Sequence, residues 1–480
     1  MKKIYTTLVL LCAVAFANGQ IVSIPDINFK LKLLSASTTN QIAKDLNGNW
    51  TVIDTNGDNL IQQSEANNIS YLNITRSESS PSINSIQGIL GFNNLEELNL
   101  IDISLTSLNL SSLTNLEILK YENYFGLNNF NSFNVSGCTN LKKFSLIDHL
   151  SINYINFNDY NNTGLMFDFS NLQNLEEFYF SYKVSESDIL DSNAFNFTNC
   201  INLKKIKFID QYVSSYNLNL QNLPNLKEFY YNGVYNVNSI NLSNSTNLES
   251  FYYDTTSFGT ITNANSNFSN FSNLNNFYFH VNGSLEINAL SFDNCTSLES
   301  LDIYCGTHIG IINELDLQDC VVLENLSVSK FSIQNILTPN TSSLKTINIT
   351  NTPITSLNLE NKNQLESLII SNNQLTTLDL SDCGNLQSVN CDNNNLQFIS
   401  FKNNTNETKS FLNNPNLTYI CADDIEQQSV QLIVNLYEMW DTCVVGDYCS
   451  FTPNGNYNTI SGNALYDNET NGCDTNDAPF

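Results

Sequence analysis

A short leucine-containing motif, N-L-x-x-L-x-L with its variants, recurs along most of this chain and constrains its fold more than any other feature. We call the first leucine of each copy the anchor. The fourteen anchors are Leu95, Leu116, Leu141, Leu175, Leu203, Leu226, Leu248, Leu274, Leu298, Leu323, Leu344, Leu365, Leu386 and Leu417. Successive anchors lie 21 to 28 residues apart, except for intervals of 34 and 31. A repeat this short cannot bury its apolar side chains alone, so the copies must stack into a solenoid.

Each repeat carries two apolar segments, which predict two short strands per coil. After the anchor, apolar and polar residues alternate, as in a strand with every second side chain inward. A second apolar pair usually precedes the anchor by eight and six residues, as at Leu108 and Leu110, Phe133 and Val135, Phe195 and Phe197, Leu315 and Leu317, and Leu378 and Leu380. The many β-branched, aromatic and Asn residues disfavour a long helix. We therefore expect a strand-rich α/β repeat over residues 91–411, with a parallel sheet on its concave face.

These motifs resemble those of leucine-rich-repeat proteins exported by Bacteroidetes bacteria, and more distantly those of the internalins. The resemblance extends from about Ile24 to the C-terminus. It implies a solenoid closed by a cap at each end, whose outward concave residues contact a partner. The repeats between Leu141 and Leu203 are longer than the family norm, which leaves the coil geometry there open.

Outward concave positions fall two, four and six residues after each anchor, and those in the middle coils are rich in tyrosine. The fourth positions include Tyr179, Lys207, Tyr230, Tyr252, Tyr278 and Asp302. Charged residues stand beside them: Glu177, Lys205, Glu228, Asp254 and His280. Such a strip could stack on sugar rings or hold an extended peptide. Equally, tyrosine is a favourable strand residue, and stacking between coils would stabilise the sheet without any ligand.

Residues 20–90 precede the solenoid as a predicted N-terminal cap and contain a loop, DTNGDNLIQQSE, that matches the spacing of an EF-hand calcium loop. The expected ligands are Asp54, Asn56, Asp58, the Leu60 carbonyl, Gln62 and Glu65, because calcium needs about seven oxygens converging from one tight turn. Asn59 replaces the usual glycine, although Asn tolerates the left-handed conformation. The alternative is a polar turn bonded to itself. We expect structural calcium that stiffens the cap.

The N-terminus predicts export. Lys2 and Lys3 precede an apolar run from Leu8 to Phe16, and the small residues Ala17 and Gly19 follow. Residues 1–19 are therefore predicted to be a secretory signal peptide, which includes Cys12 and is removed. No later stretch reaches the ~20 apolar residues of a membrane span. We expect a bacterial protein that is secreted or held at the cell surface.

The charge balance restricts the partners. Lys and Arg total 19 against 47 Asp and Glu, which gives a formal net charge of -28, and Arg76 is the only arginine. Such a surface repels nucleic acid and anionic lipid, but it would accept cationic partners and divalent metal.

Five cysteines share one position in the repeat, three residues before the anchor: Cys138, Cys200, Cys295, Cys320 and Cys383. A metal cluster could be imagined, but stacking would instead make them a row of small buried hydrophobes. Cys391, at an inward strand position, and Cys305, just beyond one, favour the same interpretation.

The periodicity fails after Leu417, where a strand and a helix from about Ile425 to Met439 predict a C-terminal cap over residues 412–449. Cys421 and Cys443 bracket this helix and are the predicted disulfide, with Cys449 as the competing partner of Cys421. Residues 450–480 resemble the opening strands of a β-sandwich domain that is cut short, or else form a tail.

Three functions fit these observations. The first is an extracellular binding or adhesion protein, without enzyme activity, whose concave face engages a protein or polysaccharide. The second is a polysaccharide-active parallel β-helix enzyme. Such an enzyme would be expected to carry Arg or Lys beside acidic residues in its groove, but the only arginine, Arg76, lies outside the repeats. The third is a spacer that binds nothing.

Overall fold

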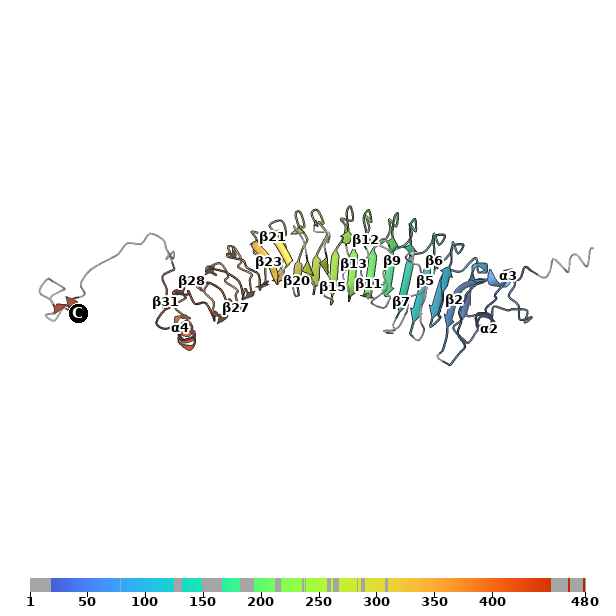
Figure 1. Cartoon of the computed structure of the whole chain (residues 1–480), viewed down its shortest axis with the longest axis horizontal. Coiled ribbons are helices and arrows are strands. Elements are labelled where there is room, and N and C mark those ends of the chain that lie inside the picture. The colour runs from blue at the N-terminus through green and yellow to red at the C-terminus, as the bar shows by residue number, and fades with distance from the viewer. Residues whose placement is uncertain are drawn as a thin grey trace, which may run out of the picture.

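The computed structural model describes residues 19–449, with gaps at 78, 125–131, 149–165, 182–193, 212–216, 235–236, 238, 257–259, 262–266, 283, 286–289 and 307–309, and also residues 465–466 and 478–479. The described residues of the repeats form a long, curved solenoid (Figure 1). Residues 1–18 of the predicted signal peptide, and most of the predicted tail or domain after Cys449, lie outside the described residues.

One wide sheet lines the concave side of the solenoid. Its sixteen strands, in spatial order, are β1 (Ala43–Asp45), β2 (Ile69–Thr75), β3 (Glu97–Ile101), β5 (Ile118–Asn123), β7 (Lys143–Asp148), β9 (Glu177–Ser181), β11 (Lys205–Gln211), β13 (Glu228–Gly233), β15 (Ser250–Thr255), β17 (Asn276–Val281), β20 (Ser300–Cys305), β22 (Asn325–Ser329), β24 (Thr346–Thr350), β25 (Ser367–Ile369), β27 (Ser388–Asn390) and β29 (Thr408–Ser410). Neighbouring strands are parallel, except that β1 runs antiparallel to β2. The predicted parallel-sheet solenoid is confirmed.

The alternation of each strand builds the core. In the β13 coil, the anchor Leu226 and the strand residues Phe229 and Tyr231 point inward and are buried, whereas Glu228 and Tyr230 between them point outward. Because adjacent coils are in register, each inward side chain stacks on its counterpart. Phe229 lies 5.2 Å, centre to centre, from Phe251 of the next coil.

Asparagine has two structural tasks in the repeat. The Asn before an anchor ties one coil to the one before it: Asn225 Nδ2 donates to the Ile201 carbonyl at 2.9 Å. A second Asn, four residues before the anchor, adopts a left-handed conformation that most residues avoid, as at Asn222 and Asn244. The side chains of these two turn residues also bond to each other at 2.9 Å. The Asn-rich composition therefore serves coil stacking as well as solubility.

Short strands form the convex wall: β4 (Ser107–Asn109), β6 (Ser132–Asn134), β8 (Phe167–Asp168), β10 (Phe195–Asn196), β12 (Asn217–Asn219), β14 (Ser239–Asn241), β19 (Leu290–Ser291), β21 (Gly310–Asp316), β23 (Phe331–Leu337), β26 (Thr377–Asp379), β28 (Phe398–Ser400), β30 (Tyr419–Cys421) and β31 (Val444–Gly446). A separate pair, β16 (Thr260–Ile261) with β18 (Ser284–Leu285), lies in sequence between the concave and convex segments of two middle coils. Unlike the concave sheet, this wall is divided into small groups, such as β4 with β6, β8 with β10, and β12 with β14. Paired strands are held about 4.8 Å apart. The outer arc of a curved stack is longer than the inner one, so its ladder must break at intervals.

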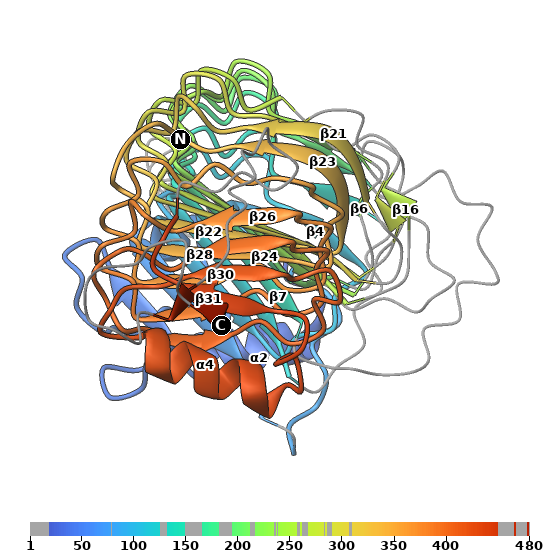
Figure 2. The same ribbon diagram turned by 90° about the vertical axis from the view of Figure 1, so that its left-hand side faces the viewer.

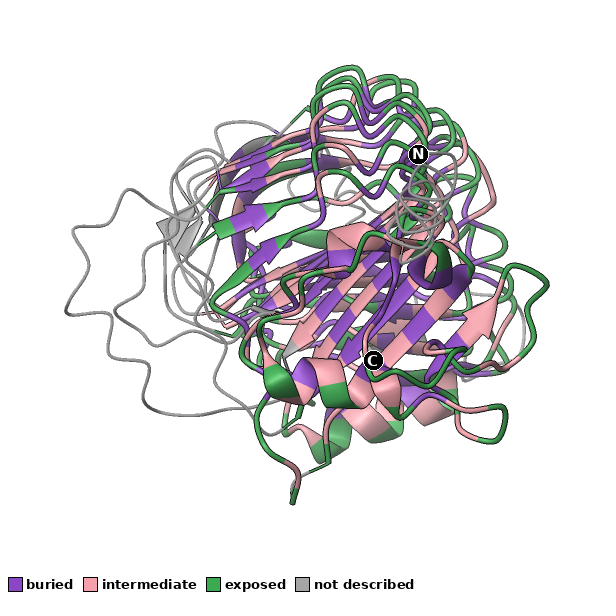
Figure 3. Ribbon diagram, turned by 90° about the vertical axis from the view of Figure 1, so that its right-hand side faces the viewer, coloured by how far each residue is buried: buried purple, intermediate pink, exposed green. Residues whose placement is uncertain are grey.

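The two ends carry the helices, as Figures 2 and 3 show from opposite directions. At the N-terminal end are α2 (Ile27–Leu34), α3 (Gln63–Ala66) and the short 3-10 helix η1 (Ile89–Gly91). At the C-terminal end, α4 spans Gln427–Leu436, shorter than the predicted helix at both ends. Outside the solenoid, β32 (Leu465–Tyr466) pairs with β33 (Ala478–Pro479).

The assignment of Leu417 as the last concave anchor is wrong. The strand after it, β30, pairs with β28 on the convex wall, and the last concave strand is β29. The long final interval therefore contained an unrecognised coil. Its strand reads Thr-Lys-Ser and places Lys409 at an inward, buried position, so no apolar alternation marked it.

Candidate ligand-binding face

The six concave residues predicted to contact a ligand lie side by side in one row. Successive register partners across β9, β11, β13, β15, β17 and β20 are Tyr179, Lys207, Tyr230, Tyr252, Tyr278 and Asp302. Each side chain is half-buried, with one edge open to solvent. A second row, two residues further along the same strands, contains Asp254, His280 and Tyr304. We call these two rows the tyrosine strip.

Three tyrosines of the strip form a continuous stack. The ring centres of Tyr230 and Tyr252 are 4.5 Å apart with an 8° angle between their planes, and those of Tyr252 and Tyr278 are 4.4 Å apart with a 3° angle. Both faces of the Tyr252 ring are therefore covered by protein.

The ends of the stack are also covered. The Lys207 ammonium lies 5.4 Å from the centre of the Tyr230 ring, within range of a cation–π interaction. The His280 ring stacks on Tyr278 at 3.8 Å. Since a sugar needs an open ring face to stack on, this packing disfavours sugar stacking on the three rings. The strip instead presents ring edges and hydroxyl groups.

The hydroxyl hydrogens of the strip are directed at neighbouring side chains of the protein. Tyr252 donates to Asp254 Oδ2 at 3.3 Å, and Tyr179 donates to Glu177 Oε2 at 3.4 Å. Tyr278 shares a hydrogen bond of 2.7 Å with His280 Nδ1. Burial and the nearby Asp254 carboxylate raise the pKa of Tyr278, so this hydroxyl is protonated at neutral pH. The solvent side of the strip therefore offers mainly hydrogen-bond acceptors.

A histidine, a carboxylate and a lysine complete the strip. His280 Nε2 lies 3.0 Å from Asp302 Oδ1, a distance that suits an ion pair, although the angle does not meet that of a hydrogen bond. Lys330 Nζ donates to the Tyr304 hydroxyl at 3.1 Å.

Many lysines of the concave strands are already paired with glutamates of adjacent coils. Lys205 lies 2.8 Å from Glu228, and Lys143 lies 3.0 Å from Glu177. A second ladder runs along the start of the strands, joining Glu117 to Lys142, Glu176 to Lys204, Lys227 to Glu249 and Glu324 to Lys345. Exposed pairs of this kind contribute little stability. Each pair cancels one positive and one negative charge, so Asp254 and Asp302 outnumber Lys207 among the remaining charges of the strip.

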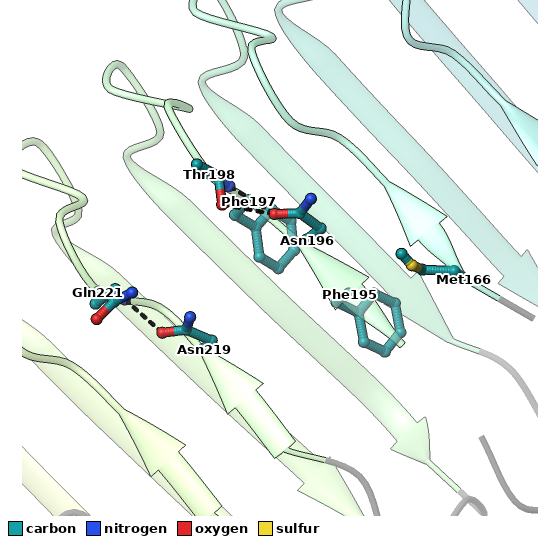
Figure 4. A pocket seen from close by; sticks show the side chains of 7 residues that line it. All are labelled: Met166, Phe195, Asn196, Phe197, Thr198, Asn219 and Gln221. Carbon is teal, nitrogen blue, oxygen red and sulfur yellow. Dashed lines mark hydrogen bonds between the residues drawn. The ribbon is translucent and has the colours of Figure 1, made fainter. Parts of the chain in front are cut away.

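A hollow of about 200 Å³ lies on the convex wall and not on the tyrosine strip. Figure 4 shows its lining: Met166, Phe195, Asn196, Phe197, Thr198, Asn219 and Gln221. It opens where β10 and β12 do not pair, one of the breaks in this wall. Asn196 and Asn219 use their Oδ1 atoms to accept the backbone N–H groups of Thr198 and Gln221. We attribute the hollow to curvature.

The predicted calcium loop folds around its own amides. Asn59 has the left-handed conformation expected of the sixth position, and its N–H donates to Asp54 Oδ2 at 2.9 Å. Asp58 accepts from both Asn56 Nδ2 at 3.1 Å and Gln62 Nε2 at 2.8 Å. Four of the predicted ligands, Asp54, Asn56, Asp58 and Gln62, thus lie in one turn.

Glu65, the predicted bidentate ligand, is turned to other partners. Its carboxylate accepts the backbone N–H of Thr55 at 2.8 Å and that of Gln62 at 3.0 Å. Over the part of the chain that the structure describes, no three His, Cys, Asp or Glu residues converge as a metal site.

Comparison with solved structures returned proteins of leucine-rich-repeat type. An internalin from Listeria monocytogenes has 16% identity and a TM-score of 0.36, with 89% of this chain and 96% of that chain covered. The functional domain of InlJ from the same organism, which includes a cysteine ladder, has 19% identity and a TM-score of 0.39, with 79% and 77% covered. An LRR protein from Leptospira interrogans has 16% identity and a TM-score of 0.39, with 80% and 97% covered.

No protein-family model matches the sequence, and no curated protein matches it either. The fold assignment therefore rests on the repeat and on the strand register. No helix in the described ranges is both long enough and apolar enough to cross a membrane.

The cysteines three residues before the anchors are buried, as predicted, and most of them also act as hydrogen-bond donors. The Cys138 thiol points at the Leu110 carbonyl of the preceding coil at 3.2 Å, and Cys200 points at Phe169 at 3.1 Å. Ser245, at the same place in its coil, makes the equivalent bond to Leu220. Burial raises the pKa of Cys138 and Cys200 to about 12, so these thiols are protonated and chemically inert.

The predicted disulfide between Cys421 and Cys443 is wrong. Cys421 is bonded to Cys449, with the Cα atoms 5.3 Å apart, and Cys443 is a buried free thiol. β30 and β31 run parallel with Cys421 beside Gly446, three residues from both Cys443 and Cys449, so the path of the chain on either side of β31 decides the pairing. Cys443 precedes β31 and its thiol is buried, whereas Cys449 lies in the segment that leaves β31 after Gly446 and returns to Cys421.

Proposed function

We propose that this chain is an extracellular binding protein, without catalytic activity, whose tyrosine strip holds a protein partner. The observation that carries the proposal is the stack of Tyr230, Tyr252 and Tyr278, which fixes three hydroxyl edges in a row on the open concave sheet. Side chains held in one arrangement lose little entropy on binding, and this favours affinity. The predicted signal peptide supports the extracellular location.

The chemistry of the strip favours a basic, extended protein segment as the partner. Tyr252 and Tyr179 direct their hydroxyl hydrogens at carboxylates of the protein, so acceptors face outward. Asp254 and Asp302 add negative charge, and the whole chain carries a formal charge of -28. Lys and Arg side chains of a partner would supply hydrogen-bond donors and positive charge to a strip in which Asp254 and Asp302 outnumber Lys207.

The test is binding of purified protein to an array of basic, neutral and acidic peptides together with neutral glycans. We expect basic peptides to bind, and Tyr252→Ala to weaken binding roughly tenfold or more, since it breaks both stacking contacts. Tyr252→Phe keeps the stack and should retain most of the affinity. Ser327→Ala, in the same row beyond the strip, is the matched control. Binding to glycans alone, or binding indifferent to Tyr252→Ala, would contradict the proposal.

Deletion of coils separates a receptor from a spacer. Removing whole coils between Leu175 and Leu298 takes away most of the tyrosine strip and shortens the solenoid. Loss of peptide binding is expected. A chain that keeps its biological function after this deletion would instead be a spacer.

We further propose that the loop from Asp54 to Glu65 binds calcium in a structural role. Asp54 and Asp58 lie in one turn, with the Asn56 and Gln62 amides bonded to Asp58. The ion would require these amides to present their oxygens, and Glu65 to exchange the Thr55, Asn56 and Gln62 N–H groups and the Thr55 hydroxyl for calcium, with the Leu60 carbonyl as a further ligand. Adding calcium after chelation should raise the melting temperature, while Glu65→Gln should abolish that rise. An equal melting temperature with and without calcium would refute the site.

A further inference from the structure

Each end of the solenoid exposes an apolar helix face. At the C-terminal end, Leu432 and Leu436, one turn apart on α4, are 63% and 76% exposed, and Ile425 and Trp440, just outside the two ends of this helix, are 71% and 63% exposed. At the N-terminal end, Ile27 and Leu31, one turn apart on α2, are 61% and 56% exposed. Scattered apolar residues on a surface are ordinary, but a contiguous set on one helix face indicates a contact surface.

The charges around the two faces are opposite. α2 contains Lys30 and Lys32 and no acidic residue. The C-terminal face is flanked by the exposed acids Asp424, Glu438 and Asp441, and no basic residue follows Lys409 in the sequence. Two copies of the same face carry charge of the same sign and repel each other. The N-terminal and C-terminal faces carry opposite charge and attract each other.

The positions of the two helices suit contact between copies. α2 and α4 lie at opposite ends of the long axis (Figure 1), and the view along that axis projects them onto the same side of the molecule (Figure 2). A second copy displaced along the axis therefore brings its α2 towards the α4 of the first. We propose that copies of this protein associate head to tail, with Leu432, Leu436 and Trp440 of one copy packed on Ile27 and Leu31 of the next.

This contact joins two different surfaces, so it is heterologous and leaves a free face at each end of the assembly. It predicts short open chains whose length grows with protein concentration. The contact is independent of the tyrosine strip, which would face the same side in every copy.

The test is sedimentation of the purified protein over a wide concentration range, with one variant for each end. The weight-average mass of the parent should rise with concentration. Leu31→Glu and Leu436→Glu should each weaken association roughly tenfold or more, because each buries an unpaired charge. Ile201→Glu changes an exposed isoleucine in a middle coil and should behave as the parent. Both main substitutions are at exposed positions, and far-ultraviolet circular dichroism verifies that the variants fold.

Mixing the two variants decides between head-to-tail and symmetric contacts. Leu31→Glu retains an intact C-terminal face and Leu436→Glu an intact N-terminal face, so an equimolar mixture should form a heterodimer that neither forms alone. If Leu31→Glu still dimerises by itself, α4 packs on α4 and the proposal is wrong. The proposal is also overturned if the parent is monomeric at all concentrations, which is the result expected if the chain's own termini cover these faces.

Discussion

Lys409 occupies an inward position of the solenoid and is stabilised there by two glutamates. Its ammonium lies 2.6 Å from Glu426 Oε2 and 3.8 Å from Glu407 Oε1, and all three side chains are almost entirely buried. One lysine cannot neutralise two carboxylates. Burial accordingly raises the pKa of Glu426 above its ordinary value of 4.5, against the opposing effect of Lys409.

The raised pKa of Glu426 makes stability depend on pH. The folded state holds the Glu426 proton more tightly than the unfolded state does. Protonated Glu426 therefore contributes stability that is fully present below about pH 4.5, and this contribution is lost as pH rises through the folded-state pKa. Glutamine cannot ionise. As pH rises from below 4.5 through the folded-state pKa of Glu426, the denaturant midpoint of the Glu426→Gln variant should therefore fall less than that of the parent. Asp424→Asn, at an exposed acid nearby, should leave the parent's pH slope unchanged. Parallel pH profiles for parent and Glu426→Gln would exclude this role.

At the scale of elements, β31 closes the convex wall by pairing with β30, and the Cys421–Cys449 disulfide holds the chain after it against the solenoid. A cross-link over 28 residues of sequence is worth about 3.6 kcal/mol in the loop-entropy account. Its contribution is local, because solenoid coils contact mainly their neighbours.

Substitution of the cysteines tests this pairing. Cys449→Ser should lower the stability of the C-terminal unit by about 3.6 kcal/mol, as followed by Trp440 fluorescence during denaturation. Cys443→Ser should leave the disulfide intact, and peptide mapping under non-reducing conditions should still find Cys421 joined to Cys449. A Cys421–Cys443 peptide in the parent would contradict this pairing.

Across the whole molecule, the formal charge of -28 opposes compaction, while the ladders of Glu–Lys pairs between coils favour it. The pairs are exposed and individually weak, whereas the net repulsion involves the entire chain. Repulsion should therefore dominate at low ionic strength.

Salt should consequently stabilise the fold. Raising sodium chloride from about 0.01 M to about 1 M shortens the Debye length from about 30 Å to about 3 Å and screens the repulsion. We expect the melting temperature at pH 7 to rise by several degrees. A falling melting temperature would mean that the inter-coil pairs, such as Lys227 with Glu249, outweigh the net charge.

The sequence alone determined the features that repeat. Inward and outward positions follow from alternation within a strand, so the anchors through Leu386 and the row from Tyr179 to Asp302 could be placed without coordinates. Stacking of like coils then dictates that like positions become neighbours. The pattern is local, and local patterns predict what every coil has in common.

Only the tertiary structure decided what depends on the register between particular segments. β29 was missed because Lys409 is buried there by pairing with Glu426, far along the chain, so its strand lacks the apolar signature. The choice of Cys449 over Cys443 depends on the path of the chain after β31, which brings Cys449 back to Cys421. Whether the tyrosine rings offer open faces depends on how closely they stack, with the ring centres of Tyr252 and Tyr278 4.4 Å apart. It also depends on the Lys207 and His280 side chains, which cover the ends of the stack. Such distances follow from three-dimensional packing, which a one-dimensional repeat does not specify.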